Sequence, residues 1–248
     1  MWFQLQQFAS TPYFVQLMLI STLSITFIQF LAFRAWGGDP LHLWIRSGVI
    51  GMWTMSVTSA GIISFERHKG TLVHLVGGRI SPLYPLLAVV SAASIFGIGA
   101  FVVAWGSWSL LSGSLAPLAD DGSFGLIHTI TGITLCWVSS VCMSLVIASI
   151  FVLTPNAIAY EQLLVQPLLI ASGILFTQSS IPKWLEVIGF VTPLGSATRL
   201  LFVRQESIPF LLTAAQTLGT AALWCLLAAF LGHKALQRVR VTATLEVI

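Results

Sequence analysis

The chain has 248 residues, of which 56% are hydrophobic and only 8% are charged, and its formal net charge is +3. A mean hydropathy of +0.93 excludes an ordinary water-soluble domain. The small basic excess gives no reason to expect a nucleic-acid partner, because basic residues in such a chain anchor the ends of membrane helices. The composition therefore predicts one membrane domain over residues 1–248, surrounded by membrane lipid.

The first residues, Met1-Trp2-Phe3-Gln4, lack the basic segment and the small-residue cleavage site of a secretory signal. The apolar run that follows is also too long for one. We therefore expect the N-terminal segment to be retained as part of the membrane domain.

Charged residues divide the chain into six long charge-free windows, and a membrane span needs roughly 20 residues. The sequence predicts six spans with these approximate limits: Tyr13–Ala35, Gly48–Phe65, Leu83–Leu111, Phe124–Leu153, Glu161–Phe176 and Phe210–Ala235. The fifth is short, and Pro167 predicts a kink in it. The predicted fold is thus all-α and polytopic, without room for a soluble catalytic domain.

The connections between these spans are brief. Residues 36–40 (Trp-Gly-Gly-Asp-Pro) predict a turn after the first span, and residues 113–122 predict a polar loop after the third. With both termini in the cytoplasm, the basic residues divide six to five in favour of the cytoplasmic side. The cytoplasmic set is Arg67, Lys69, Arg79, Lys234, Arg238 and Arg240, and the external set is Arg34, Arg46, Lys183, Arg199 and Arg204.

A charged segment, residues 64–75 (Ser-Phe-Glu-Arg-His-Lys-Gly-Thr-Leu-Val-His-Leu), separates the second and third predicted spans. On a helix, Phe65, Leu72 and Leu75 fall on one stripe, which predicts a short amphipathic helix at the membrane surface. Gly77-Gly78 predicts its end, and Ser81-Pro82 predicts the start of the third span. Two interpretations remain open: a solvated loop that fixes topology, or a helix that docks on a soluble partner.

Two stretches resemble signatures of the ABC-2 type transporter permeases, in the same order. Residues 65–82, with Gly70-Thr71-Leu72 and then Ser81-Pro82, resemble the cytoplasmic signature of that family. Residues 173–199, with Ile181-Pro182-Lys183-Trp184-Leu185 and Thr192-Pro193-Leu194, resemble the re-entrant external segment between its fifth and sixth helices. Together with six spans, the likeness covers most of the chain.

The resemblance implies a permease subunit of an ATP-driven exporter in the bacterial inner membrane. It implies a separate ATPase subunit that holds ATP and Mg, because the chain has no phosphate-binding loop motif and is not itself expected to be an enzyme. It also implies a second permease subunit, identical or related. The residues that would couple the chain to the ATPase are Phe65, Glu66, Arg67, Lys69, Gly70, Thr71, Leu72 and Leu75.

Two further sites follow from the resemblance. An external lid would contain Pro182, Trp184, Pro193 and Arg199. A substrate path along the contact between subunits would contain Met52, Trp53, Met55, Ile170 and Phe176. Because these path residues are apolar and aromatic, they favour a drug-like, peptide or lipid-like amphiphile over an ion or a sugar.

Isolated cysteines and polar residues, and the motifs that the chain lacks, bear on alternative functions. Cys136, Cys142 and Cys225 lie in apolar runs and are expected to be small buried hydrophobes. His128 and Glu161 are expected at membrane interfaces. An intramembrane enzyme is the main alternative, yet the chain lacks the Gly-x-Ser-Gly and His-Glu-x-x-His motifs that such enzymes use. A secondary transporter or a non-transporting membrane protein also remains open.

Overall fold

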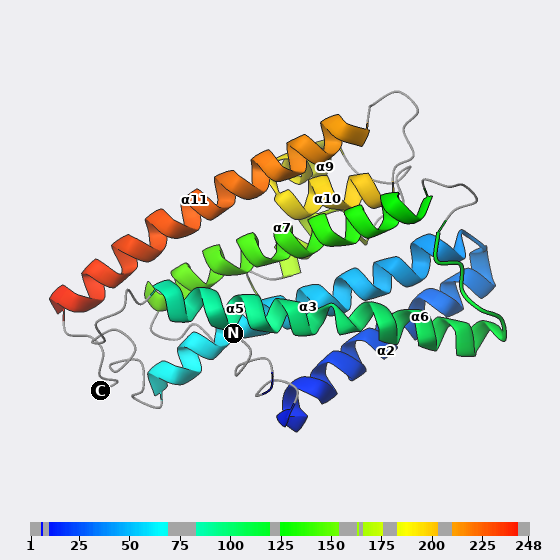
Figure 1. Cartoon of the computed structure of the whole chain (residues 1–248), viewed down its shortest axis with the longest axis horizontal. Helices are drawn as coiled ribbons and strands as arrows, with labels where there is room; N and C mark the ends of the chain where they lie inside the picture. The colour runs from blue at the N-terminus through cyan, green and yellow to red at the C-terminus, as the bar shows by residue number, and fades with distance from the viewer. Residues whose placement is uncertain are drawn as a thin grey trace.

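The computed structural model of the chain is a bundle of long α-helices (Figure 1). It describes residues 6, 10–68, 83–119, 125–153, 163, 166–175, 183–202 and 210–242, and these contain no strand. The main helices are α2 (Pro12–Trp36), α3 (Pro40–His68), α5 (Leu83–Gly97), α6 (Gly99–Ser112), α7 (Gly125–Leu153), α9 (Lys183–Val191), α10 (Pro193–Phe202) and α11 (Phe210–Thr242). The all-α class is confirmed.

Four helical stretches among the described residues are long and apolar enough to cross a membrane. They are Pro12–Trp36, Leu87–Ser112, Gly125–Val152 and Phe210–Lys234, which match the first, third, fourth and sixth predicted spans. The second predicted span lies within α3. Of the fifth, the described residues are helical at 163 and over 166–171 and then turn, so the six-helix topology stays a prediction.

Helix α3 begins at Pro40, eight residues before the start predicted from charge. Asp39 caps it, because its Oδ1 accepts a hydrogen bond from the Leu41 N–H at 2.9 Å, and proline suits the first helical position. The predicted span limit at Gly48 falls inside this helix, because Arg46 was taken to end the span. Arg46 is instead buried inside the helix bundle.

The third predicted span consists of two helices, α5 and α6, that meet at Ile98 (Figure 1). There the hydrogen bonds tighten to three-residue spacing, from Ile98 N to Ile95 O at 3.1 Å and from Phe101 N to Ile98 O at 3.0 Å. The backbone at Ile98 remains right-handed and helical, so the irregularity is a local tightening in a continuous rod.

Helix α7 is the centre of the bundle and contacts α3, α5, α10 and α11. Helix α3 packs on its other side against α2 and α6. The approach of α2 to α3 depends on Gly51, because a Cβ there would lie 2.9 Å from the Ala100 Cβ and would overlap the Thr22 hydroxyl. Small residues at such contacts let membrane helices approach closely.

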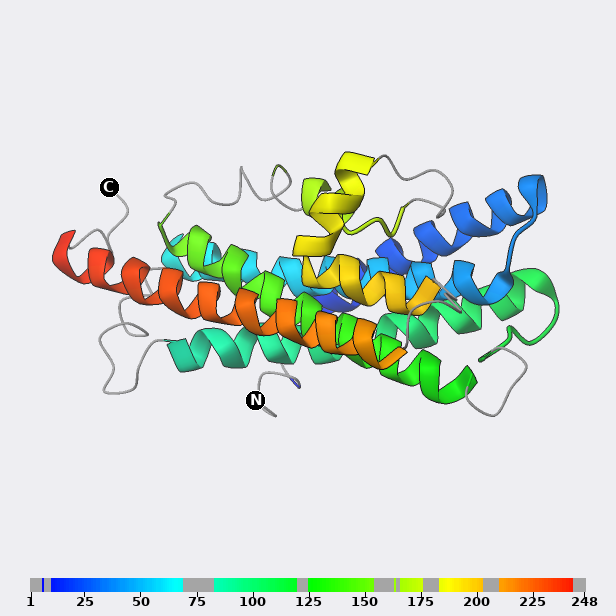
Figure 2. The same ribbon diagram turned by 90° about the horizontal axis from the view of Figure 1, so that it is seen from above.

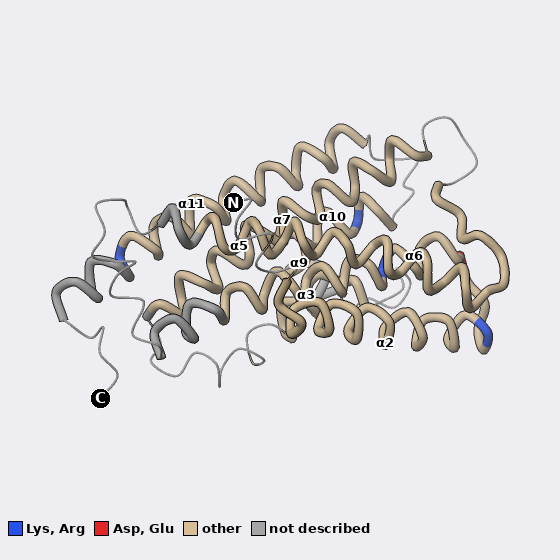
Figure 3. The backbone as a smooth tube through the Cα atoms, turned by 60° about the horizontal axis from the view of Figure 1, so that its bottom comes forward, with Lys and Arg blue, Asp and Glu red and all other residues tan. Residues whose placement is uncertain are grey.

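Helices α2 and α11 flank the bundle and keep large apolar side chains exposed. The exposed residues include Ile20, Phe27, Leu31, Leu211, Leu223, Leu226 and Phe230. Few charged positions are marked along the described backbone (Figure 3). Exposed apolar helix faces with so little charge fit a lipid surround, and the chain is a multi-pass membrane protein.

The bundle has two opposite ends (Figure 1). We call the end with residues 36–40 and 113–119 the α2–α3 end. The opposite end, where α3 ends and α5 begins, we call the α3–α5 end. Helices α7 and α11 also end at the α3–α5 end, so the connections alternate between the two ends as expected for successive membrane crossings.

Candidate functional site

The predicted coupling segment begins on the last turn of α3. Phe65, Glu66 and Arg67 lie within this helix, which continues to His68. The sequence had predicted a separate surface helix for this segment, but these three residues extend α3 instead. The other predicted coupling residues, Lys69, Gly70, Thr71, Leu72 and Leu75, lie outside the described residues.

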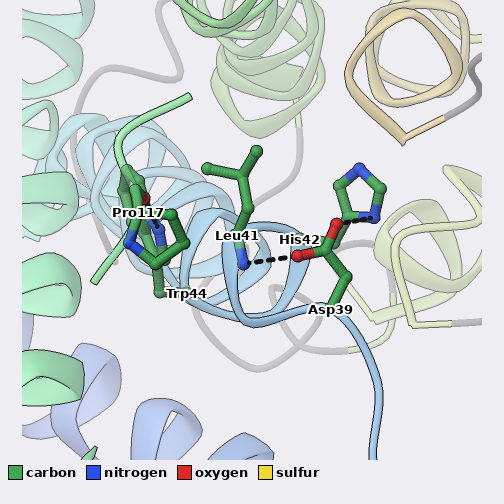
Figure 4. A network of polar contacts seen from close by, with 5 residues as sticks. All are labelled: Asp39, Leu41, His42, Trp44 and Pro117. Carbon is green, nitrogen blue, oxygen red and sulfur yellow. Dashed lines mark hydrogen bonds and ion pairs between the residues drawn. The ribbon is translucent and has the colours of Figure 1, made fainter. Parts of the chain in front are cut away.

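The other end of α3 carries a compact set of polar contacts (Figure 4). Besides capping the Leu41 amide, the Asp39 carboxylate lies 3.3 Å from His42 Nδ1. The Trp44 Nε1–H donates a hydrogen bond to the Pro117 carbonyl at 2.9 Å. These contacts fix both the first turn of α3 and its distance from the connection that follows α6.

A second indole holds the same connection. Trp105 Nε1–H donates to the Ala116 carbonyl at 3.1 Å, and the Ala116 N–H donates to Ser109 Oγ at 3.0 Å. The 113–119 connection is thus tied to α6 at Trp105 and Ser109 and to α3 at Trp44. Tryptophan suits this position because it combines an apolar ring with one N–H donor.

The predicted external lid consists of α9 and α10, joined at Thr192. Helix α9 turns away from the direction that α7, α10 and α11 share (Figure 2). Trp184 on α9 is 65% exposed, whereas Pro193 opens α10 in a buried position. Pro182 lies outside the described residues. The segment therefore has an exposed arm and a buried arm.

Hydrogen bonds hold α10 and the end of α9 in place. Ser139 Oγ of α7 donates to the Pro193 carbonyl at 3.1 Å, and Thr198 Oγ1 donates to the Ser172 carbonyl at 2.8 Å. At the end of α9, Trp224 Nε1–H of α11 donates to the Val191 carbonyl at 2.9 Å. Nearly every side chain of α10 is buried, so this arm belongs to the core of the bundle.

The corner between α9 and α10 requires glycine at position 195. A Cβ on Gly195 would lie 2.8 Å from Thr192 Oγ1 and 2.9 Å from the Gly189 carbonyl carbon, and it would overlap the Gly189 oxygen. Because two of these atoms belong to backbone, they cannot move aside as a side chain would. The absence of a side chain at Gly195 thus permits the sharp return of the chain.

The Arg199 guanidinium lies over the Phe190 ring, 3.4 Å from its centroid. This contact joins the two arms of the predicted lid, because Phe190 belongs to α9 and Arg199 to α10. Arginine stacks well on aromatic faces because its guanidinium is planar and weakly hydrated.

A second aromatic contact joins α10 to α3. The Arg46 guanidinium lies 5.5 Å from the Phe202 ring centroid, and the His42 ring meets the same phenyl edge to face at 5.6 Å. Arginine stays protonated in proteins, so a permanent cation is held here. Phe202, the last residue of α10, therefore contacts two side chains from the first two turns of α3. We call this contact of Phe202 with Arg46 and His42 the clasp.

The residues predicted for a substrate path are placed differently from one another. Met52, Trp53 and Met55 are buried within the described core of a single chain, with Met55 in one apolar cluster with Met18 and Ala100. Ile170 is 39% exposed. Phe176 lies outside the described residues. Met52 and Trp53 belong instead to the main apolar core, so the structure places the α3 residues in two clusters and the path itself stays a prediction.

Sequence reasoning missed Phe202, Phe190 and His42 as contact residues. Asp39-Pro40 was the available signal at the start of α3, because a capping residue followed by proline marks a helix N-terminus. Nothing local marked Phe202, which matters only through contacts distant in sequence. Of the two isolated polar residues, His128 is half-buried with its ring 5.2 Å from that of Phe210, and Glu161 lies outside the described residues.

Comparison with known proteins gives one family. A family model described as ABC-2 type transporter matches residues 1–204. This range covers α2 through α10 and includes both ends of α3 and both arms of the α9–α10 pair. The comparison with curated proteins found no match, and neither did the comparison with solved structures.

Proposed function

We propose that this chain, which belongs to the ABC-2 type transporter family, is the permease subunit of an ATP-driven exporter. A separate ATPase subunit would bind ATP and Mg and supply the power. The bacterial inner membrane is the proposed location. What supports the proposal is the family match together with a bundle of helices long and apolar enough to span a membrane.

One observation carries the proposed mechanism: α3 is an unbroken helix from Pro40 to His68. At 1.5 Å per residue, its 29 residues span about 43 Å, more than the roughly 30 Å of a hydrocarbon core. One end reaches the predicted coupling segment, and the other clasps Phe202 of α10. A push on the first end would therefore reach the lid as a rigid-body motion, because long packed helices do not compress.

The pair α9–α10 is the proposed external lid. Its buried arm, α10, contacts α7 and α11, while the exposed arm, α9, presents Trp184 at the surface. When α3 moves, the clasp at Phe202 would carry α10 with it, and the Arg199–Phe190 contact would carry α9. The lid would then open or close the outer end of the path.

The proposed cargo is an amphipathic or hydrophobic compound, such as a drug, an antimicrobial peptide or a lipid-like molecule. The apolar composition of the chain supports this class over ions and sugars, because a carrier of charged cargo needs ionisable groups within its spans. A second permease subunit would complete the path, as an identical or a related chain.

The coupling role is tested by Leu72→Asp. We expect the variant to insert in the membrane. ATP-driven uptake of an amphipathic dye into inverted vesicles, which measures export, should fall at least about tenfold, because a charge on the apolar stripe prevents docking. Val73→Asp, about 100° around the predicted helix, is the matched control and should lose less. Intact export by Leu72→Asp, with ATP turnover that still responds to the dye, would rule the coupling role out.

A further inference from the structure

Two cysteines from different helices meet near the middle of the bundle. Cys142 of α7 and Cys225 of α11 have their sulfur atoms 2.6 Å apart. This separation is far closer to an S–S bond of about 2.05 Å than to an ordinary contact between two thiols. The two residues are 83 positions apart in sequence, so their proximity is a product of the fold.

One neighbouring hydrogen bond joins α7 to α11, and another ties α11 to the end of α9. Ser149 Oγ of α7 donates a hydrogen bond to the Ala228 carbonyl of α11 at 3.2 Å. Toward the start of α11, the Trp224 indole is held by the Val191 carbonyl. The cysteine pair therefore lies within a packed helix contact, and only a small movement separates the two sulfurs from bonding distance.

We propose that Cys142 and Cys225 form a reversible disulfide that links α7 to α11. The site is independent of the proposed export function, since it rests on the packing of two helices. Cys142 is buried and Cys225 is half-buried on a helix that is largely exposed to lipid. A lipid-soluble oxidant can approach the pair from this side, while water-soluble thiols in the cytoplasm have poor access to it.

A bound metal ion is a weaker explanation for the close sulfurs. Metal sites of this kind need three or four ligands, and two thiols supply only two. Among the described residues, no group of three or more His, Cys, Asp or Glu side chains is placed to hold an ion. The third cysteine, Cys136, is six positions from Cys142, on a different face of α7, and supplies an internal control.

A membrane-permeant azodicarboxamide can oxidise the two thiols to the disulfide. One thiol adds across the N=N bond and forms an S–N bond. The thiolate of the second cysteine then attacks that sulfur, forms the S–S bond and displaces the nitrogen. The two thiol protons and two electrons end on the reagent, which leaves as the hydrazine, and a phosphine reductant reverses the linkage.

The test uses the full-length chain in its membrane, reduced first and then treated with the azodicarboxamide. The protein is denatured with excess maleimide, and its intact mass counts the free thiols. We expect one maleimide, on Cys136, after oxidation and three after renewed reduction. Proteolysis should yield one reducible peptide pair that contains Cys142 and Cys225.

Two variants sharpen this result. Cys136→Ser should retain the linkage and take up no maleimide after oxidation. Cys225→Ser should take up two maleimides with or without the oxidant. Three maleimides on the oxidised native chain, or a linkage that includes Cys136, would overturn the proposal.

Discussion

At the scale of single residues, the corner at Gly195 offers the sharpest stability test. Gly195→Ala places a methyl group against the Gly189 backbone, and overpacking of this kind costs about 1–3 kcal/mol. We expect the apparent unfolding temperature of the detergent-purified protein to fall by several degrees. The loss should exceed the small gain that alanine gives over glycine in a helix.

Gly219→Ala is the matched control, because a Cβ at Gly219 on α11 meets nothing within 4 Å. Its unfolding temperature should stay the same or rise slightly. Equal changes in unfolding temperature for the two variants would show that Gly195 does not pack closely against the Gly189 backbone.

A local motif in the sequence marked Pro193, Trp184 and Arg199, and all three lie on the α9–α10 pair. Their role in a lid stays a prediction. Phe202 could not be found, because its partners His42 and Arg46 are about 160 positions away and no motif connects them. The pairing of Cys142 with Cys225 escaped for the same reason, and the sequence favoured buried thiols.

At the scale of helices, charge-free windows predicted α2, α7 and α11 well, because lipid-exposed or central apolar helices exclude charge along their length. The same criterion misplaced the start of α3, where Arg46 is accommodated by the Phe202 ring. The sequence also left residues 173–199 as one re-entrant segment, whereas α9 and α10 within it are two helices that meet at Thr192. Tertiary contacts, which composition does not record, made these differences.

The clasp between α3 and α10 predicts the effect of Phe202→Ala. Truncation removes the ring that Arg46 and His42 contact, so movement of α3 would no longer reach the lid. We expect dye export in inverted vesicles to fall about tenfold, the factor given by roughly 1.4 kcal/mol of lost contact energy, while ATP turnover by the assembled complex persists.

Phe230→Ala on α11 is the control for that variant, since Phe230 is 56% exposed on the outer face of the bundle. It should export at close to the native rate. Unchanged export by Phe202→Ala, at equal amounts of protein in the membrane, would refute a transmission role for the clasp.

At the scale of the whole molecule, the alternation of connections predicts opposite exposure of the two ends (Figure 1). In a background where the three native cysteines are replaced by alanine, Gly38→Cys should react with an impermeant maleimide in intact cells. Thr71→Cys should react only after the membrane is opened. Labelling of Thr71→Cys from outside would reverse the proposed orientation.

The sequence predicted the membrane class and the family, which the family match confirms over residues 1–204, but not whether the proposed second permease subunit is identical or related. The exposed apolar faces of α2 and α11 satisfy contact with lipid and contact with another helix equally well, because both surroundings are apolar. Burial of Met52, Trp53 and Met55 within one chain likewise depends on packing that an apolar sequence pattern does not reveal.

Photo-crosslinking tests directly whether an ATPase subunit docks where α3 ends. A benzophenone amino acid is placed at Leu72 of the full-length chain, and Trp36, 85% exposed at the α2–α3 end, serves as the control position. The account predicts an adduct with a copurifying ATPase from position 72 and none from position 36. An ATPase adduct from position 36 alone, or none from either position in a complex that still contains the ATPase, would contradict it.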